Sequence, residues 1–66
     1  MNLRITLEAA RVNVKLTQEE AAKALNVTKK TISSWENGKT FPKTGKIDAI
    51  CALYQIECDN IKWNAG

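Results

Sequence analysis

The chain contains no histidine, and only two of its 66 residues are cysteines. Without histidine, neither a zinc site nor a haem site can be assembled from the usual ligands. The sequence also shows no nucleophile beside a base and no cluster of metal-binding side chains. We therefore expect a protein that is not an enzyme and that holds no cofactor or metal.

The two cysteines, Cys51 and Cys58, are seven positions apart. Cys51 falls within an apolar helical pattern, and Cys58 lies between Ile56 and Ile61. Free cysteines are often buried as small apolar side chains, so we expect two reduced core thiols rather than reactive ones. Reduced thiols in turn predict a cytoplasmic protein.

Long hydrophobic runs are missing as well. The N-terminal segment MNLRITLEAA has no continuous apolar stretch, and no run approaches the ~18 residues that span a bilayer. We expect neither secretion nor a membrane partner. With no repeat or linker, residues 1–66 are expected to form a single domain, with residues 64–66 frayed. A net charge of +3 slightly favours an anionic partner.

Apolar residues at helical spacing predict a first helix that begins after Asn2 and runs to about Asn13. Its apolar positions are Leu3, Leu7, Ala10 and Val14. A capping box, in which Thr17 and Glu20 bond each other's backbone amides, predicts a second helix from Gln18. Ala21, Ala22 and Leu25 would face the core, and Asn26 would end this helix in the left-handed conformation.

Thr28 is expected to cap a third helix only about three residues later, with Val27 packing on Ile32. Such a short connection is typical of a helix-turn-helix. Ile32 and Trp35 would point to the core, and Gly38 would end the helix. The opposite face is polar and free of acidic residues; it comprises Lys29, Lys30, Ser33, Ser34 and Asn37. Residues 39–43 would form an exposed loop, called the basic loop below.

Thr44 is expected to cap a fourth helix that ends near Gln55. Its apolar positions are Ile47, Ile50, Cys51, Leu53 and Tyr54. Asp59 could cap a last short helical turn that carries Ile61 and Trp63. The sequence therefore predicts an all-α fold, a compact bundle of five short helices in which the second and third form the helix-turn-helix.

These residues resemble the helix-turn-helix domain shared by the phage lambda-type repressors, the Cro proteins and their bacterial relatives, known as the Cro/C1-type family. The resemblance covers nearly the whole chain and rests on the combination of TQEE (17–20), LNVTKKTI (25–32), WENGK (35–39) and Pro42. It implies a lambda-repressor-like domain of five helices whose third helix, about residues 28–37, enters the major groove of DNA.

The resemblance also implies roles for individual residues. Lys29, Lys30 and Ser34 match positions that contact base edges. The positions expected to contact phosphates are Gln18, Thr28, Thr31, Asn37, Lys39, Thr40 and Lys43. Arg11 and Glu36 match a structural ion pair of the family. Lys15 stands where the family commonly has a glycine, which predicts a strained or altered turn there.

The function expected on these grounds is sequence-specific binding of double-stranded DNA by a transcriptional regulator, a repressor of bacterial or phage origin. One recognition helix reads too few base pairs to find a site in a genome. We therefore expect a homodimer on a pseudo-palindromic operator, joined through the C-terminal part at Ile61 and Trp63. The alternative is a protein-binding adaptor or antitoxin-like module with the same fold, which an exposed Trp63 and Ile61 would favour.

Overall fold

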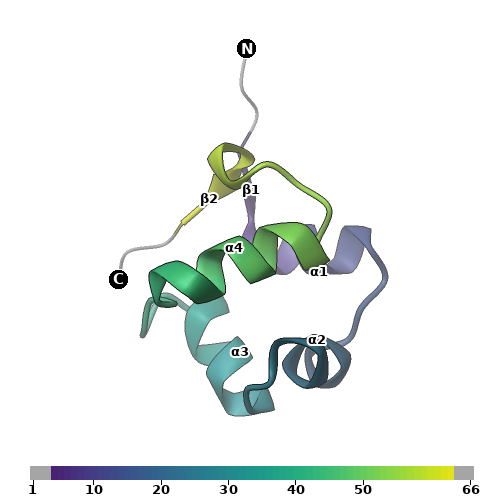
Figure 1. The fold of residues 1–66 in the computed structure, drawn as a ribbon, viewed down its shortest axis with the longest axis vertical. Coiled ribbons are helices and arrows are strands. Elements are labelled where there is room, and N and C mark those ends of the chain that lie inside the picture. Colours follow the sequence, from purple (N-terminus) through teal and green to yellow (C-terminus); the bar gives the residue numbers. More distant parts are fainter. Residues whose placement is uncertain (1–3, 64–66) are drawn as a thin grey trace.

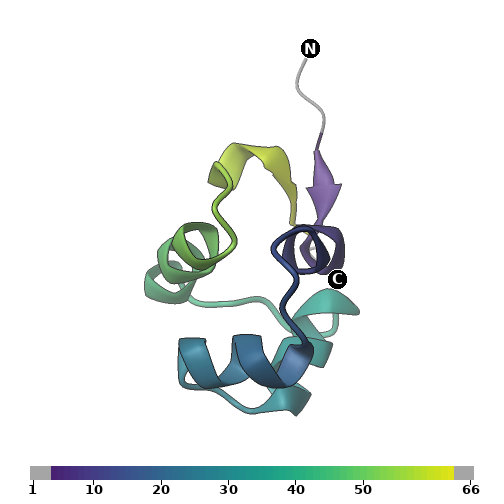
Figure 2. The same ribbon diagram turned by 90° about the vertical axis from the view of Figure 1, so that its right-hand side faces the viewer.

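Helices α2 (Gln18–Leu25) and α3 (Lys29–Glu36) lie at one end of the molecule, opposite a pair of two-residue strands (Figures 1 and 2). The computed structural model describes residues 4–63. Between the two ends lie α1 (Leu7–Asn13) and α4 (Thr44–Leu53). The strands are β1 (Ile5–Thr6) and β2 (Ile61–Lys62), which follows the 3₁₀ helix η1 (Cys58–Asn60). The predicted bundle is thus mostly helical, with four α-helices in the described residues.

The first helix begins later than the sequence indicated. Its N-cap is Thr6, whose side chain accepts a hydrogen bond from the Ala9 amide at 3.1 Å. Ile5 and Thr6 are β-branched and favour extended backbone, so they form β1 instead of a helical turn. The predicted cap Asn2 and the apolar position Leu3 lie outside the described residues.

The chain after α4 also differs from the prediction of a fifth helix. Residues Cys58–Asn60 form one 3₁₀ turn, and the N-cap position belongs to Glu57 rather than Asp59. Ile61 then pairs with Ile5 in a parallel register, with Ile61 only 2% exposed. Ile61 is β-branched and favours extended backbone, and β1 offers it backbone hydrogen bonds. Pairing with β1 therefore stabilises this segment more than a longer helical turn would.

Helix α4 begins at Thr44, so Thr44 is its first helical residue and not its cap. The N-cap is Lys43, which makes no side-chain capping bond. Lys43 directly follows Pro42 and keeps an extended backbone, with ψ of 159°. Within α4, Lys46 Nζ donates to the Leu25 carbonyl at 2.6 Å, which satisfies a carbonyl at the C-terminal end of α2.

The core lies between the four helices and is closed by the strand pair. Helix α2 contributes two small residues that let α3 and α4 approach closely, and Ile32 and Ile50 fill the centre at 1% and 0% exposure. The buried apolar side chains are Leu7, Ala10, Ala21, Ala22, Leu25, Ile32, Trp35, Ile50, Cys51, Tyr54 and Ile61. The predicted inward positions of α2, α3 and most of α4 are therefore confirmed.

All four α-helices end with the same pair of backbone hydrogen bonds around a residue of positive φ. These residues are Lys15 (62°), Asn26 (58°), Gly38 (74°) and Gln55 (55°). After α3, for example, the Gly38 amide donates to the Trp35 carbonyl and the Lys39 amide to the Ser34 carbonyl. This is the Schellman arrangement. It confirms the predicted ends at Asn26 and Gly38, and it places Lys15 in the strained left-handed conformation that the resemblance predicted for this turn.

Cys51 and Cys58 form a disulfide, so the prediction of two reduced thiols is wrong. The left-handed Gln55 turns the chain back after α4 and brings the two Cα atoms to 5.5 Å, a normal disulfide separation. No free cysteine occurs in the part of the chain that the structure describes. Closing so short a loop is worth about 2 to 3 kcal/mol by the chain-entropy argument.

Candidate nucleic-acid interface

The outward face of α3 is built by the capping and packing of that helix. Thr28 Oγ1 accepts from the Thr31 amide at 3.1 Å and lies 2.9 Å from the Thr31 hydroxyl. Ile32 and Trp35 turn inward at 1% and 7% exposure, which leaves the predicted polar face uncovered. Lys29 and Lys30 occupy the first turn of this face and are exposed.

The ten residues predicted to contact DNA come from the start of α2, from α3 with its cap, and from the basic loop. None of them is buried. The exposed ones are Thr28, Lys29, Lys30, Asn37, Lys39, Thr40 and Lys43, and the partly buried ones are Gln18, Thr31 and Ser34. The fold thus gathers them around one end of the molecule, while their individual roles stay predictions.

The charge of α3 and the basic loop is positive. Residues 28–43 contain four lysines and one acidic residue, Glu36. Glu36 does not face outward, since its side chain is 6% exposed and pairs with Arg11, which is 10% exposed. The charge presented to solvent by α3 and the basic loop is therefore that of the lysines.

Three side chains from three helices meet at the Glu36 carboxylate. Arg11 Nε donates to Glu36 Oε2 at 2.7 Å, and Gln18 Nε2 donates to Glu36 Oε1 at 2.9 Å. Arg11 Nη1 also donates to the Leu16 carbonyl at 2.7 Å, which ties down the turn between α1 and α2. The hydrogen bond to Glu36 raises the pKa of Arg11, against the opposing effect of burial. The ion pair expected from the resemblance is present, and it orients Gln18.

Sequence reasoning missed the Gln18–Glu36 hydrogen bond. The two residues are 18 positions apart on different helices, and no local spacing signals such a contact. The bond leaves the second hydrogen of the Gln18 amide nitrogen free, at the N-terminal end of α2. Because helix N-termini carry a partial positive charge, this hydrogen lies where an anion is favoured.

The basic loop is held at both ends. The Lys39 and Thr40 amides both donate to the Ser34 carbonyl, at 3.0 and 3.5 Å, and Pro42 is buried. Between these anchors Phe41 is 47% exposed and packs against Trp63, with ring centroids 5.9 Å apart at an angle of 48°. Lys39 and Lys43 are thereby placed beyond the C-terminal end of α3.

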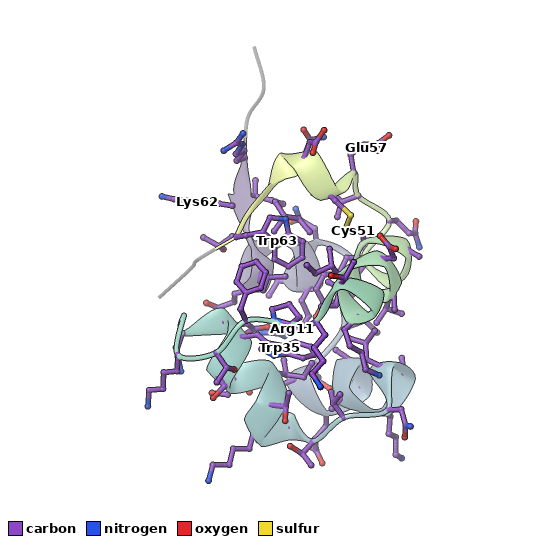
Figure 3. All side chains as sticks on the ribbon, turned by 60° about the vertical axis from the view of Figure 1, so that its left-hand side comes forward. Arg11, Trp35, Cys51, Glu57, Lys62 and Trp63 are labelled. Atoms are coloured by element: carbon purple, nitrogen blue, oxygen red, sulfur yellow. A yellow bond between two sulfur atoms is a disulfide. The ribbon has the colours of Figure 1, made fainter. Side chains whose placement is uncertain are left out.

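The predicted C-terminal interface residues have different environments. Ile61 is 2% exposed within the core, so its side chain is not available to a partner. Trp63 is half-buried, and its Nε1 donates to the Cys58 carbonyl at 3.0 Å (Figure 3). Of this pair, only Trp63 can contribute surface.

Two other properties of the described residues bear on function. No helix among residues 4–63 is long and apolar enough to cross a membrane. Within the same range, the structure shows no group of three or more cysteine and carboxylate side chains that could hold a metal ion.

Comparison with known proteins gives a family for this architecture. The sequence model of the Helix-turn-helix family matches residues 7–61, which is most of the chain. The chain therefore belongs to this family, and the Cro/C1-type identification is confirmed. It is similar to the HTH-type transcriptional activator BcrR of Enterococcus faecalis, with 33% identity over 55 residues.

The aligned region makes up 83% of this chain but 27% of BcrR, so the chain spans about a quarter of that relative's length. No solved structure matches the chain significantly.

Proposed function

We propose that this domain binds double-stranded DNA and regulates transcription, with α3 in the major groove. The outward face of α3 carries the proposal, because it is polar, free of uncompensated acid and flanked by lysines from the basic loop. Membership of the helix-turn-helix family and the likeness to a transcriptional activator support it. An α-helix fits the major groove, and phosphate-binding groups on both sides would fix its position.

Base contacts are assigned to the exposed residues of α3. Lys29 and Lys30 in its first turn would donate to the O6 and N7 acceptors of guanine. Ser34 lies one turn further along the helix. Its side chain is shorter than that of lysine, so it would contact a base edge only where the helix lies close to the bases. Two lysines at these positions supply affinity more readily than discrimination, because an ammonium group also fits a phosphate.

Phosphate contacts are assigned to groups around this helix. Gln18 would use its free amide hydrogen together with the α2 N-terminus. Thr28 and Thr31 lie at the start of α3, and the remaining contacts come from its end and the basic loop: Asn37, Lys39, Thr40 and Lys43. Such contacts make affinity fall with salt, at a logarithmic slope of about −0.9 per phosphate neutralised by a lysine.

We further propose a homodimer on a pseudo-palindromic operator, since one recognition helix reads few base pairs. Two copies would place their α3 helices about 34 Å apart, one turn of B-DNA. A repressor role, a bacterial or phage origin and a cytoplasmic location belong to the same proposal. BcrR is named as an activator, and the sign of regulation follows from where the operator lies relative to the promoter.

Selection of bound sites from a random duplex library tests this function. We expect a consensus of two inverted half-sites, with centres 10 to 11 base pairs apart or a whole number of turns further. Enrichment of a single, asymmetric short site would contradict the dimer while leaving DNA binding intact. Failure to enrich any sequence, with no shift of random duplex at low salt, would contradict DNA binding itself.

A further inference from the structure

The Cys51–Cys58 disulfide joins the last turns of α4 to the segment that returns to β1 (Figure 3). Cys51 is 7% exposed on the inner side of α4, whereas Cys58 is only half-buried. Cys58 also borders a surface hollow whose other lining residues are Arg4, Asp59, Ile61 and Trp63. A thiolate in solution therefore has better access to the sulfur of Cys58 than to that of Cys51.

Cys58 is also the anchor of the C-terminal segment, residues 58–63. Its carbonyl oxygen accepts two hydrogen bonds, one from the Ile61 amide and one from Trp63 Nε1 at 3.0 Å. The Trp63 ring packs in turn on Phe41, which lies in the middle of the basic loop. A continuous series of contacts thus runs from α4, through the disulfide, to the loop that carries Lys39 and Lys43.

We propose that Cys51 and Cys58 form a thiol–disulfide exchange site for a dithiol reductant, and that its redox state sets how strongly the domain binds DNA. The second half of this proposal rests on the DNA-binding function proposed above. In the cytoplasmic location proposed above, disulfides are usually catalytic or redox-sensing rather than permanent. Because the function proposed above is DNA binding and not catalysis, the sensing role fits this disulfide better.

The exchange proceeds in two balanced steps. A thiolate of the dithiol attacks the Cys58 sulfur, forms a mixed disulfide and releases Cys51 as a thiolate, which takes up a proton. The second thiol of the reductant then displaces Cys58 and closes its own disulfide. Two electrons and two protons pass to the protein, and the dithiol becomes oxidised.

Reduction removes the covalent tie between α4 and the C-terminal segment, which then depends on the two-residue pairing of β2 with β1, on the buried Ile61 and on the partly buried packing of Cys58 and Trp63. The Cys58 carbonyl that accepts from Trp63 Nε1 is then no longer fixed to α4, so Trp63 gains freedom to move and its packing on Phe41 weakens. The start of the basic loop stays bonded to the Ser34 carbonyl, so the loss is partial. We expect affinity for DNA to fall roughly three- to tenfold. The slope of log affinity against log salt concentration should become shallower by about 0.9, the value for one phosphate contact.

The test compares the oxidised domain with the domain reduced by dithiothreitol, using fluorescence anisotropy with a labelled duplex at several salt concentrations. Circular dichroism at the same temperature checks that both forms are folded. The indole N–H signals of Trp35 and Trp63 in NMR spectra provide a readout that needs no DNA. Reduction should shift the Trp63 signal strongly and the Trp35 signal little.

Two variants separate the disulfide from the route it uses. Cys51→Ser/Cys58→Ser should bind like the reduced domain and should not respond to dithiothreitol. Phe41→Ala keeps the disulfide, so it tests the contact between Trp63 and the basic loop even if the reduced domain unfolds. It should lower the affinity of the oxidised protein by the same three- to tenfold factor, which corresponds to the loss of roughly one phosphate contact. Trp63 should keep its bond to the Cys58 carbonyl in this variant.

The outcomes distinguish this proposal from the DNA-binding function. If the oxidised domain binds no duplex, the proposed function is wrong and the redox control falls with it. If oxidised and reduced folded domains bind equally, or if Phe41→Ala binds like the wild type, only the redox control is overturned. A disulfide that dithiothreitol leaves intact in the folded protein would overturn the exchange site.

Discussion

Gln18 and Glu36 join the first residue of α2 to the last residue of α3, with the Gln18 amide nitrogen 2.9 Å from the carboxylate. Arg11 of α1 binds the same carboxylate, at 2.7 Å to its other oxygen. One buried side chain therefore connects the helix-turn-helix to the rest of the domain and orients a residue predicted to contact a phosphate. This arrangement gives Glu36 a role in stability and, if Gln18 contacts a phosphate as proposed, in binding.

Replacing Glu36 with glutamine should destabilise the domain by about 3 kcal/mol, because it leaves the largely buried guanidinium of Arg11 without a counter-charge. The measurement is urea unfolding followed by tryptophan fluorescence. For a chain of 66 residues, a loss of this size is a large part of the total stability.

The matched control for Glu36→Gln removes both charges. Arg11→Met/Glu36→Leu should recover most of the lost stability, because apolar pairs of similar volume often replace buried ion pairs without loss. If the loss of stability in the double variant equalled the sum of the losses in Arg11→Met and Glu36→Leu, the two side chains would not be coupled as described.

Glycine at two helix ends should stabilise the protein. Lys15 and Gln55 hold φ values of 62° and 55°, a conformation that costs a side-chain-bearing residue about 1 to 2 kcal/mol. Part of this gain is lost to the greater freedom of glycine in the unfolded chain, so we expect about 0.5 to 1 kcal/mol for each of Lys15→Gly and Gln55→Gly.

The control for the glycine substitutions is Ala49→Gly, at an exposed position inside α4. It should destabilise by about 1 kcal/mol, since glycine is a poor helix former. Thermal unfolding under identical conditions compares the three variants. Destabilisation by Lys15→Gly would show that the Lys15 side chain contributes more than its backbone strain costs.

The hydroxyl of Tyr54 should ionise only at unusually high pH. Burial, reinforced by the carboxylate of Glu36, raises its pKa from 10.0 to about 12. The folded protein holds this proton more tightly than the unfolded chain, so the stabilising contribution is complete below about pH 10. It is lost as the pH rises from 10 to about 12.

Tyr54 is the single tyrosine of the chain, so ultraviolet difference absorbance follows its ionisation without interference from another phenol. We expect a midpoint near 12 in buffer and near 10 in concentrated urea. Equal midpoints in both solvents would contradict the burial of this side chain.

The sequence predicted the parts of the fold that depend on local chemistry. The capping box of Thr17 and Glu20 is formed by two hydrogen bonds, of 2.9 and 3.1 Å. The left-handed ends at Asn26 and Gly38 and the inward positions of α2 and α3 also follow from short-range patterns. These features need only neighbouring residues, which is why they could be read in advance.

The ends of the chain depended on contacts between distant residues. Ile5 forms a strand because Ile61, 56 positions later, lies beside it. Cys51 and Cys58 pair because the turn at Gln55 reverses the chain, which spacing alone did not reveal. The first error comes from tertiary structure overriding a local helical pattern, and the second from a reversal of the chain that local spacing does not show.

The sequence nominated the residues of the candidate site, whose roles stay predictions, but it did not indicate how they are held in place. The polar face of α3 could be identified from its periodicity, and the pairing of Arg11 with Glu36 from the family resemblance. The Gln18–Glu36 bond and the contact of Phe41 with Trp63 join separate elements and leave no signal in the sequence. These two contacts hold Gln18 and the basic loop, which carry groups proposed to bind phosphates.

The central claim, that α3 meets DNA through its first-turn lysines, is tested most directly by the salt dependence of duplex binding in Lys29→Ala/Lys30→Ala. Lys62→Ala is the control, because Lys62 is also exposed but lies on β2, away from the first turn of α3 (Figures 1 and 3).

We expect the double variant to bind at least tenfold more weakly at moderate salt. If both lysines contact phosphates, the salt slope should become smaller by up to about 2 × 0.9. If they contact guanine instead, the variant should lose base preference. Lys62→Ala should keep the wild-type slope. Equal losses in the double variant and in Lys62→Ala would contradict the assignment of α3 as the DNA-binding helix.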